Sequence, residues 1–243
     1  MPSLSFTVSP DGSRSTYSDF MASPQPLKLP RIDLHQPADL EPGTLADLLG
    51  TPEGRRFQGI TVQNEDLTGT SIIDSVLENI GLVDSDLSAV SVLTSWLRGL
   101  NAPHLQAPRS AWRQVMVEGS RIGAAELYEA VFDTVMLRGC KLDLVNLRGA
   151  RLTDVVLDSC TIGELDLTAA SVRRLQLRSC DVDVLILSQA SLAHADLRGC
   201  RLRQLVGLDS LRGAVISPEQ LTDLAPSFAE QLGLSVLAPD GGA

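Results

Sequence analysis

Residues 137–160 read LRGCKLDLVNLRGARLTDVVLDSC, and leucine stands at 137, 142, 147, 152 and 157. This five-residue register extends in both directions, from Phe57 to Leu202. All 30 of its positions are apolar, without an insertion. In a chain that is 44% apolar, chance would give such a run roughly once in 10¹¹ trials. The period therefore reflects the fold.

Neither a single helix nor a single strand explains a period of five. On an α-helix, five residues advance the direction of the side chain by about 140°, which would spread the apolar positions over every face. On one long strand, an odd step would place successive positions on opposite faces. The register therefore predicts a chain that turns a corner every five residues and points the central residue of each side inward.

The residue two places before each central one should also point inward, and these residues repeat with a period of 20. One column of identical residues is Cys140, Cys160, Cys180 and Cys200. Four sides of five residues make one turn, so the register predicts an all-β solenoid of about 7.5 coils, roughly 36 Å tall at about 4.8 Å per strand. The first coils depart from the pattern with polar residues at this inner position: Glu65, Thr70, Ser75, Ser85 and Ser95.

The pattern resembles the pentapeptide-repeat proteins, whose motif is loosely A(D/N)LxG. Good local matches are EDLTG at 65–69, NLRGA at 146–150 and ADLRGC at 195–200. The resemblance implies a right-handed quadrilateral parallel β-helix. A leucine-rich repeat can also have a period near 20, but its L-x-x-L-x-L-x-x-N pattern does not recur here.

The chain divides into four predicted segments: a flexible N-terminal segment, an N-terminal cap, the β-helix and a C-terminal helical cap, over residues 1–30, 31–56, 57–206 and 207–243. In the N-terminal cap we expect a strand over Arg31 to Leu34 and a short helix over Leu45 to Leu49, which together close the first coil.

The C-terminal cap should be helical over 217–233, with Ser217 as the N-cap, Gln220 completing a capping box and Pro226 dividing it into two short helices. Its apolar face has two interpretations. It covers the last coil, or it forms a homodimer interface, which the resemblance implies because family members pair through C-terminal elements. The face consists of Leu221, Leu224, Phe228 and Leu232.

Three further features of the coil are predicted from its columns. Ala102 and Ala107 are small central residues, each followed by proline, so the coil should bow or lose strand pairing there. Trp112 and Phe132 lie 20 residues apart and should stack in one inner column. An outer column alternates in charge and should form salt bridges between coils: Arg98, Glu118, Arg138, Asp158, Arg178 and Arg198.

Composition and motifs exclude several function classes. The chain has 20 basic and 30 acidic residues, a net charge of −10, which argues against direct binding of nucleic acid or an anionic membrane. The start MPSLSFTVSPDGS has no secretory pattern, so we expect a cytoplasmic protein.

Thiols stacked in one line suit neither a tetrahedral metal site nor a disulfide. His35, His104 and His194 fit no triad or metal spacing. No phosphate-binding or nucleophile motif appears, and the uninterrupted register leaves no loop to build a cleft, so we expect neither an enzyme nor a cofactor.

The acidic residues are concentrated at the start of the coil. Residues 57–97 contain six acids and no base. This excess suggests a rigid scaffold that binds another protein of unknown identity. The candidate contacts are Asp66, Asp74, Glu78, Asp84 and Asp86.

The resemblance also implies an alternative function, because some pentapeptide-repeat proteins imitate duplex DNA and bind DNA gyrase or another type II topoisomerase, conferring fluoroquinolone resistance. Duplex DNA carries one charge per about 1.7 Å, or about 20 charges over a rod of this height. The coil from 57 to 206 has a net charge of only −4.

Overall fold

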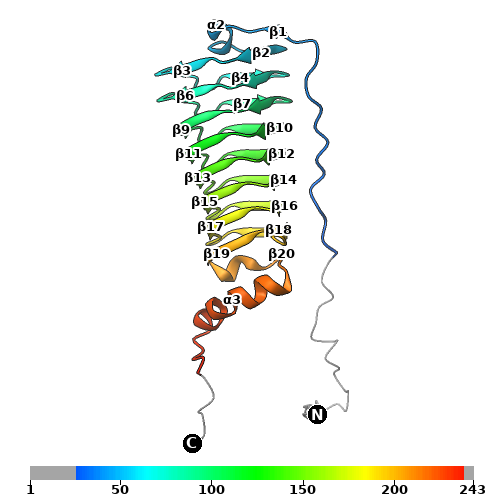
Figure 1. Cartoon of the computed structure of the whole chain (residues 1–243), viewed down its shortest axis with the longest axis vertical. Helices are drawn as coiled ribbons and strands as arrows, with labels where there is room; N and C mark the ends of the chain where they lie inside the picture. The colour runs from blue at the N-terminus through cyan, green and yellow to red at the C-terminus, as the bar shows by residue number, and fades with distance from the viewer. Residues whose placement is uncertain (1–25, 238–243) are drawn as a thin grey trace, which may run out of the picture.

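A computed structural model describes residues 26–237 of the chain, which form a tall parallel β-solenoid of about 8 turns with a helix at its C-terminal end (Figure 1). Two sheets run along the solenoid, and every strand pairs in parallel with the strand of the next turn. The all-β solenoid predicted from the register is therefore confirmed.

The larger sheet has 12 strands. They are β1 (Glu41–Pro42), β2 (Arg55–Gln58), β4 (Ser71–Ile73), β5 (Val76–Glu78), β7 (Ser91–Leu93), β8 (Trp96–Arg98), β10 (Ala111–Glu118), β12 (Val131–Arg138), β14 (Arg151–Asp158), β16 (Ser171–Arg178), β18 (Ser191–Asp196) and β20 (Ala214–Val215). The smaller sheet has 8 strands. They are β3 (Thr61–Gln63), β6 (Gly81–Val83), β9 (Asn101–Gln106), β11 (Arg121–Glu126), β13 (Lys141–Asn146), β15 (Thr161–Asp166), β17 (Asp181–Ile186) and β19 (Arg201–Val206).

Residues 20 apart lie side by side in successive turns, as Leu137 and Leu157 do in β12 and β14. We number the sides of the solenoid 1 to 4 by their central residues in the first turn: Phe57, Val62, Leu67 and Ile72. All four are buried, and each begins a column of apolar side chains that fills the interior. These columns are buried because the turns stack on one another, whereas the inner side chains of a single turn would be exposed to water above and below.

Most corners between the sides have a left-handed backbone. Positive φ occurs there at glycines such as Gly139 (φ 60°) and at residues with a Cβ such as Ala169 (φ 57°), but from Asn101 onward it is missing at the corner between sides 2 and 3. From Asn101 onward, the strands of the smaller sheet run through the corner between sides 2 and 3. The predicted loss of pairing at Ala102 is wrong for the following turn, because β9 pairs with β11 along its length. On the preceding turn the pairing is reduced to Gly81 and Asn101.

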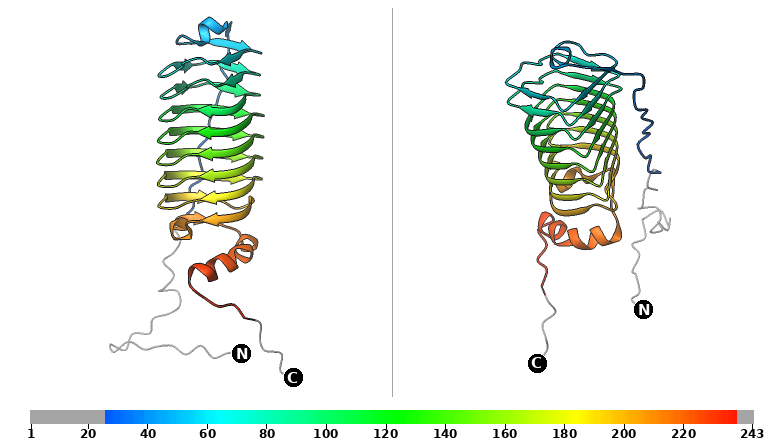
Figure 2. Two further views of the ribbon diagram at one scale, coloured as in Figure 1. Left: turned by 90° about the vertical axis from the view of Figure 1, so that its left-hand side faces the viewer. Right: turned by 45° about the horizontal axis from the view of Figure 1, so that its top comes forward.

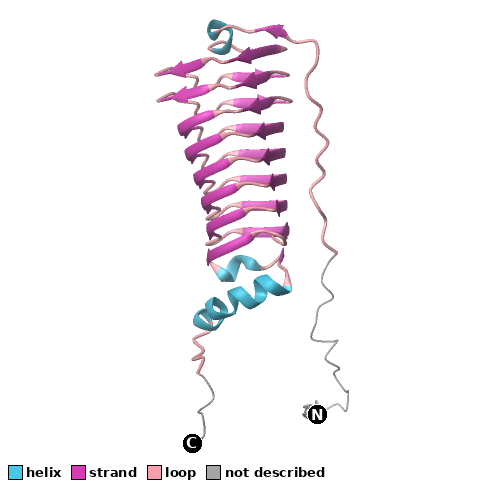
Figure 3. Ribbon diagram, in the orientation of Figure 1, coloured by secondary structure: helices cyan, strands magenta, loops and turns pink. Residues whose placement is uncertain are grey.

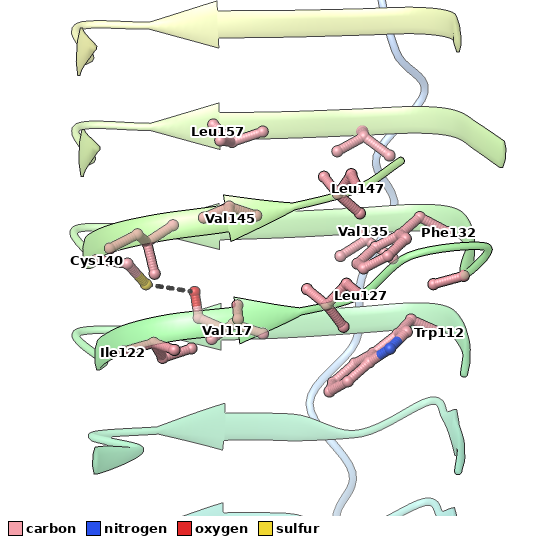
Figure 4. Close-up of a cluster of buried hydrophobic side chains, with 14 of the residues drawn as sticks. Trp112, Val117, Ile122, Leu127, Phe132, Val135, Cys140, Val145, Leu147 and Leu157 are labelled. Carbon is pink, nitrogen blue, oxygen red and sulfur yellow. Dashed lines mark hydrogen bonds between the residues drawn. The ribbon is translucent and has the colours of Figure 1, made fainter. Parts of the chain in front are cut away.

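Side chains in the interior confirm the predicted columns (Figure 4). The rings of Trp112 and Phe132 stack with centroids 6.0 Å apart and planes 7° from parallel. The Cys140 thiol donates to the backbone oxygens of Val117 (3.6 Å) and Arg138 (3.4 Å). Ser95 makes the equivalent contact, donating to the oxygen of Leu93 at 2.7 Å. Serine therefore fits the inner position of the early coils because the corner offers its hydroxyl an acceptor.

The predicted salt-bridge column is present on side 1. Glu118 pairs with Arg98 (3.2 Å) and with Arg138 (4.0 Å), and Asp158 lies 3.8 Å from Arg138. The column ends before Arg198, whose guanidinium pairs instead with Asp196 in its own turn at 2.8 Å.

Different elements close the two ends of the solenoid. At the N-terminal end, α2 (Leu45–Leu48) begins with a capping box between Thr44 and Asp47 and buries Leu48 over the first turn. At the C-terminal end, the 3-10 helix η1 (Leu208–Leu211) leads to α3 (Pro218–Gln231), which lies against the last turn (Figure 2).

The prediction that Pro226 divides the C-terminal helix is wrong, because α3 is continuous through it. Proline cannot donate the hydrogen bond that would reach the carbonyl of Thr222. Both residues are exposed, so water can solvate that carbonyl and the helix does not need to break. The capping box at Ser217 and Gln220 is confirmed.

The predicted strand over Arg31 to Leu34 is also wrong. Residues 26–36, which we call the N-terminal strap, have no regular structure and run along the outside of the solenoid from its first turns toward its last (Figures 1 and 3). Ile32 and Leu34 pack on an outward-facing apolar strip formed by Trp96, Met116, Met136 and Val156. The flexible segment predicted over 1–30 falls mainly on residues 1–25, which lie outside the described residues.

Candidate functional site

Side 3 of the solenoid holds two of the five predicted acidic contacts in one column. Asp66 and Asp86 are paired across neighbouring turns, and Gln106 follows in the third turn. Each aspartate comes directly before a buried leucine, Leu67 or Leu87. Because the leucine points into the core, strand alternation turns the aspartate outward.

Both carboxylates are held in place by the turn that follows them. Oδ1 of Asp66 accepts from the backbone N–H of Thr68 at 2.9 Å, and Oδ1 of Asp86 accepts from the N–H of Ser88 at 2.8 Å. Hydrogen bonding to Thr68, through its side chain and its backbone, lowers the pKa of Asp66. The two turns therefore fix the direction of both carboxylates, and the hydrogen bonds favour the charged form of Asp66.

Asp84 lies beside this column, at the exposed corner between sides 2 and 3, where its φ is 48°. Within residues 26–237, no basic side chain lies within ion-pair distance of Asp66, Asp84 or Asp86. These three carboxylates form one uncompensated group.

The other two predicted contacts lie elsewhere. Asp74 occupies the corner between sides 4 and 1, where the hydroxyl of Thr94 donates to it. Glu78 lies on side 1 between Arg56 (3.5 Å) and Arg98 (3.4 Å), and only 20% of its side chain is exposed. Because two guanidiniums neutralise Glu78, it is a poor contact for a basic partner.

Acidic residues farther along side 3 were missed by counting charges along the chain. Glu126 and Glu129 lie on the same side as Asp66 and Asp86. With Glu65 and Asp166, side 3 carries six acids against Arg109 and Arg148, a net charge of −4 between 57 and 206. The other three sides lie between −1 and +1 over the same range. Sorting the charges by the five-residue register would have revealed this excess.

Part of the acidic excess on side 3 is compensated. The guanidinium of Arg148 lies 2.6 Å from Asp166, which is almost fully buried. Glu126 accepts a hydrogen bond from the side-chain amide of Asn146 at 2.6 Å. The uncompensated charge is therefore greatest at the N-terminal end of the side, around Asp66, Asp84 and Asp86.

The four predicted apolar residues of the C-terminal helix divide into two pairs. Leu224 is buried and Phe228 is half-buried against the core of the last turn. Leu221 and Leu232 are 53% and 71% exposed. Three additional apolar side chains, which the helical pattern did not include, are exposed after the helix: Leu234, Val236 and Leu237.

Within residues 26–237, no group of three or more histidine, cysteine, aspartate or glutamate residues is arranged to hold a metal ion. No helix among those residues has the length and apolar character needed to cross a bilayer.

No family model and no curated protein matches the sequence. Among solved structures, a trypsin-treated form of QnrB1, a plasmid-mediated fluoroquinolone resistance protein, is 15% identical and matches 75% of this chain and 100% of its own, with a TM-score of 0.38. HetL, a pentapeptide repeat protein involved in heterocyst differentiation regulation in the cyanobacterium Nostoc sp. strain PCC 7120, is 20% identical over 68% of this chain and 90% of its own, with a TM-score of 0.25. At these TM-scores the likeness says nothing about a partner. The parallel solenoid and its register are consistent with a pentapeptide-repeat protein.

Proposed function

We propose that this chain is a non-catalytic, cytoplasmic scaffold that presents the N-terminal end of side 3 to a protein with a basic surface. The observation that supports the proposal most directly is the group formed by Asp66, Asp84 and Asp86. These carboxylates carry no ion pair among the described residues, and the turns beside Asp66 and Asp86 fix their direction. Charges held in place on a rigid coil lose little conformational entropy when a partner binds.

Charge reversal tests this function. The Asp66→Lys, Asp86→Lys double variant should lose capture of protein partners from a lysate of the source cells. Asp133→Lys with Asp143→Lys is the matched control, since it makes the same change of charge at exposed positions on sides 4 and 2. Equal capture by the wild type and both double variants would contradict the proposal.

A DNA mimic that binds gyrase is the second candidate function, and the gathering of acids on side 3 is the observation that favours it. The charge density argues against DNA mimicry, because the net charge of −4 on side 3 is far below the roughly 20 charges of a DNA segment of equal height. Purified protein would inhibit gyrase supercoiling, or protect gyrase from a quinolone, in a salt-sensitive way. No effect at about tens of micromolar would reject this function.

We further propose that two copies pair through the exposed apolar residues at the C-terminal end. Leu221 on α3, Leu232 at its end, and Leu234, Val236 and Leu237 after it are all exposed, and a second copy would cover them. Light scattering should give the mass of a dimer for the wild type and of a monomer for Leu221→Lys with Leu232→Lys. Leu45→Lys, at the opposite end of the solenoid, is the control.

A further inference from the structure

The N-terminal cap closes only two of the four sides of the first turn. On side 1, β1 pairs with β2. On side 4, Pro52 and Gly54 bond to Ile73, with N–O distances of 2.9 and 3.1 Å. On side 2, β3 is the last strand of its sheet, and no strand within residues 26–237 lies beyond it. The expectation that residues 31–56 close the first coil therefore holds for half of it.

The backbone groups that β3 leaves free follow from the bonds that it makes. The N–H of Gly81 donates to the oxygen of Ile60 (2.9 Å), and the N–H of Asn64 donates to the oxygen of Val83 (3.0 Å). Alternate residues of a parallel strand bond to opposite neighbours. Residues 60, 62 and 64 therefore face the second turn, while Thr61 and Gln63 direct their N–H and C=O groups away from the solenoid.

The opposite end of this sheet is covered. At that end β19 lies against α3, and the side-chain amide of Gln220 donates to the oxygens of Leu197 (2.7 Å) and Cys200 (2.8 Å). In Figure 1, β3 instead projects beyond α2 at the top of the solenoid. Natural proteins usually protect an unpaired edge, because it is a template for a further strand.

The side chains around β3 indicate what kind of strand would fit. Val62 is fully buried, whereas Ile60 is only partly buried at the start of the edge. Asp66 and Glu65 follow the strand, Asp84 lies one turn away, and residues 57–97 contain no base. An added segment would gain from basic side chains facing these carboxylates and from an apolar one over Ile60.

We propose that the β3 edge binds an extended segment of a partner protein as an added strand, and that this segment alternates basic and apolar residues. This inference deepens the scaffold function and rests on it, since it specifies how the partner would meet the acidic end of side 3. Thr61 and Gln63 supply two donors and two acceptors, and the carboxylates supply the preference for a basic segment.

The probe for the test is a fluorescent eight-residue peptide that alternates lysine and valine. Its binding to the full chain should fall at least tenfold in Gln63→Pro, which removes one outward N–H without removing a native ladder bond. Gln63→Ala keeps that N–H and should bind like the wild type. A peptide N-methylated at alternate amides keeps its charge and should lose binding to the wild type, as should the glutamate–valine counterpart.

The outcomes distinguish backbone pairing at the β3 edge from attraction by the nearby carboxylates. Equal binding of the methylated and unmethylated peptides would overturn strand addition, whether or not Gln63→Pro folds, while loss of partner capture in the charge-reversal variant would still support the scaffold. If Asp66→Lys with Asp86→Lys keeps both partner capture and peptide binding, the scaffold function itself fails. Concentration-dependent oligomers that Gln63→Pro abolishes would identify a second copy as the occupant and overturn the proposal of a basic partner.

Discussion

Leu157 occupies the centre of side 1, where its side chain is 6% exposed and belongs to the continuous core. Leu157→Ala should lower the free energy of unfolding by about 2–5 kcal/mol, because it removes buried methyl groups and leaves a cavity that stacked turns cannot easily close. Urea denaturation followed by circular dichroism would measure the loss. Leu29→Ala, at a side chain that is 46% exposed and lies outside the proposed dimer surface, should change stability by less than about 0.5 kcal/mol. Equal effects would show that Leu157 is not a core residue.

The corners offer a prediction of the opposite sign. Ala169 adopts φ 57°, a left-handed conformation that costs an L-residue with a Cβ about 1–2 kcal/mol and glycine almost nothing. Ala169→Gly should therefore stabilise the protein by about 1 kcal/mol. Gly139→Ala should destabilise it through the backbone alone, since an added Cβ there meets no atom within 4 Å. Thermal melting of both variants checks the pair, and a stabilising Gly139→Ala would contradict the explanation.

Among the elements, the N-terminal strap depends on one buried carboxylate. Oδ1 of Asp154 accepts from the backbone N–H of Arg31 at 2.9 Å, and the guanidinium of Arg174 binds the same side chain at 2.6 and 2.5 Å. The hydrogen bond from Arg174 lowers the pKa of Asp154. A carboxyl with a depressed pKa stabilises the folded state above its unfolded pKa, near 4, and this contribution is lost as the pH falls through the depressed value.

The strap should accordingly stay bound from neutral pH down to about pH 4 and separate from the apolar strip at lower pH. Trp96 lies under the strap and reports its release by a red shift in fluorescence, measured in a Trp112→Phe background. Asp154→Asn should shift the emission already at pH 7. Asp158→Asn, on the same strand but in contact with Arg138 and Arg178, should not. A wild-type emission that is unchanged down to pH 2.5 would contradict this role of Asp154.

The strap also shows where sequence reasoning stopped. The register predicted the solenoid because thirty positions repeat one local rule, whereas the strap is held by contacts between Arg31 and Asp154, 123 residues apart. A signal was nevertheless present. Trp96, Met116, Met136 and Val156 are 20 residues apart at outward positions of side 1, and an apolar column facing outward requires a cover. The prediction at Pro226 was wrong because proline can be accommodated inside a helix where the carbonyl that it leaves without a donor is exposed, as at Thr222.

Over the whole molecule, the register could assign each acid to a side but could not say which acids are neutralised. Glu78 and Asp86 are eight residues apart and both belong to the predicted acidic contacts. Glu78 lies between two arginines, whereas among residues 26–237 the side chain of Asp86 has only the hydrogen bonds of its own turn. Ion pairing depends on which side chains meet between turns. The column positions restrict these contacts, and the rotamers decide them. The unpaired edge at β3 could not be predicted from the register either, because it depends on which sides of the first turn the N-terminal cap pairs with.

A stack in which each turn contacts only its neighbours should open from its ends, and the four cysteines of successive turns can report this. All four are buried. Burial raises the pKa of Cys200 to about 12, and the neighbouring Cys140 thiol raises the pKa of Cys160 to about 11, so neither reacts as a thiolate in the closed state at pH 8. Thiol labelling with mass spectrometry should therefore modify Cys200, in the last turn, first and Cys160 later. Gln220→Ala removes the donor to the oxygens of Leu197 and Cys200 and should speed labelling of Cys200 selectively. Equal rates at all four sites, in both proteins, would mean that the solenoid opens only as a whole.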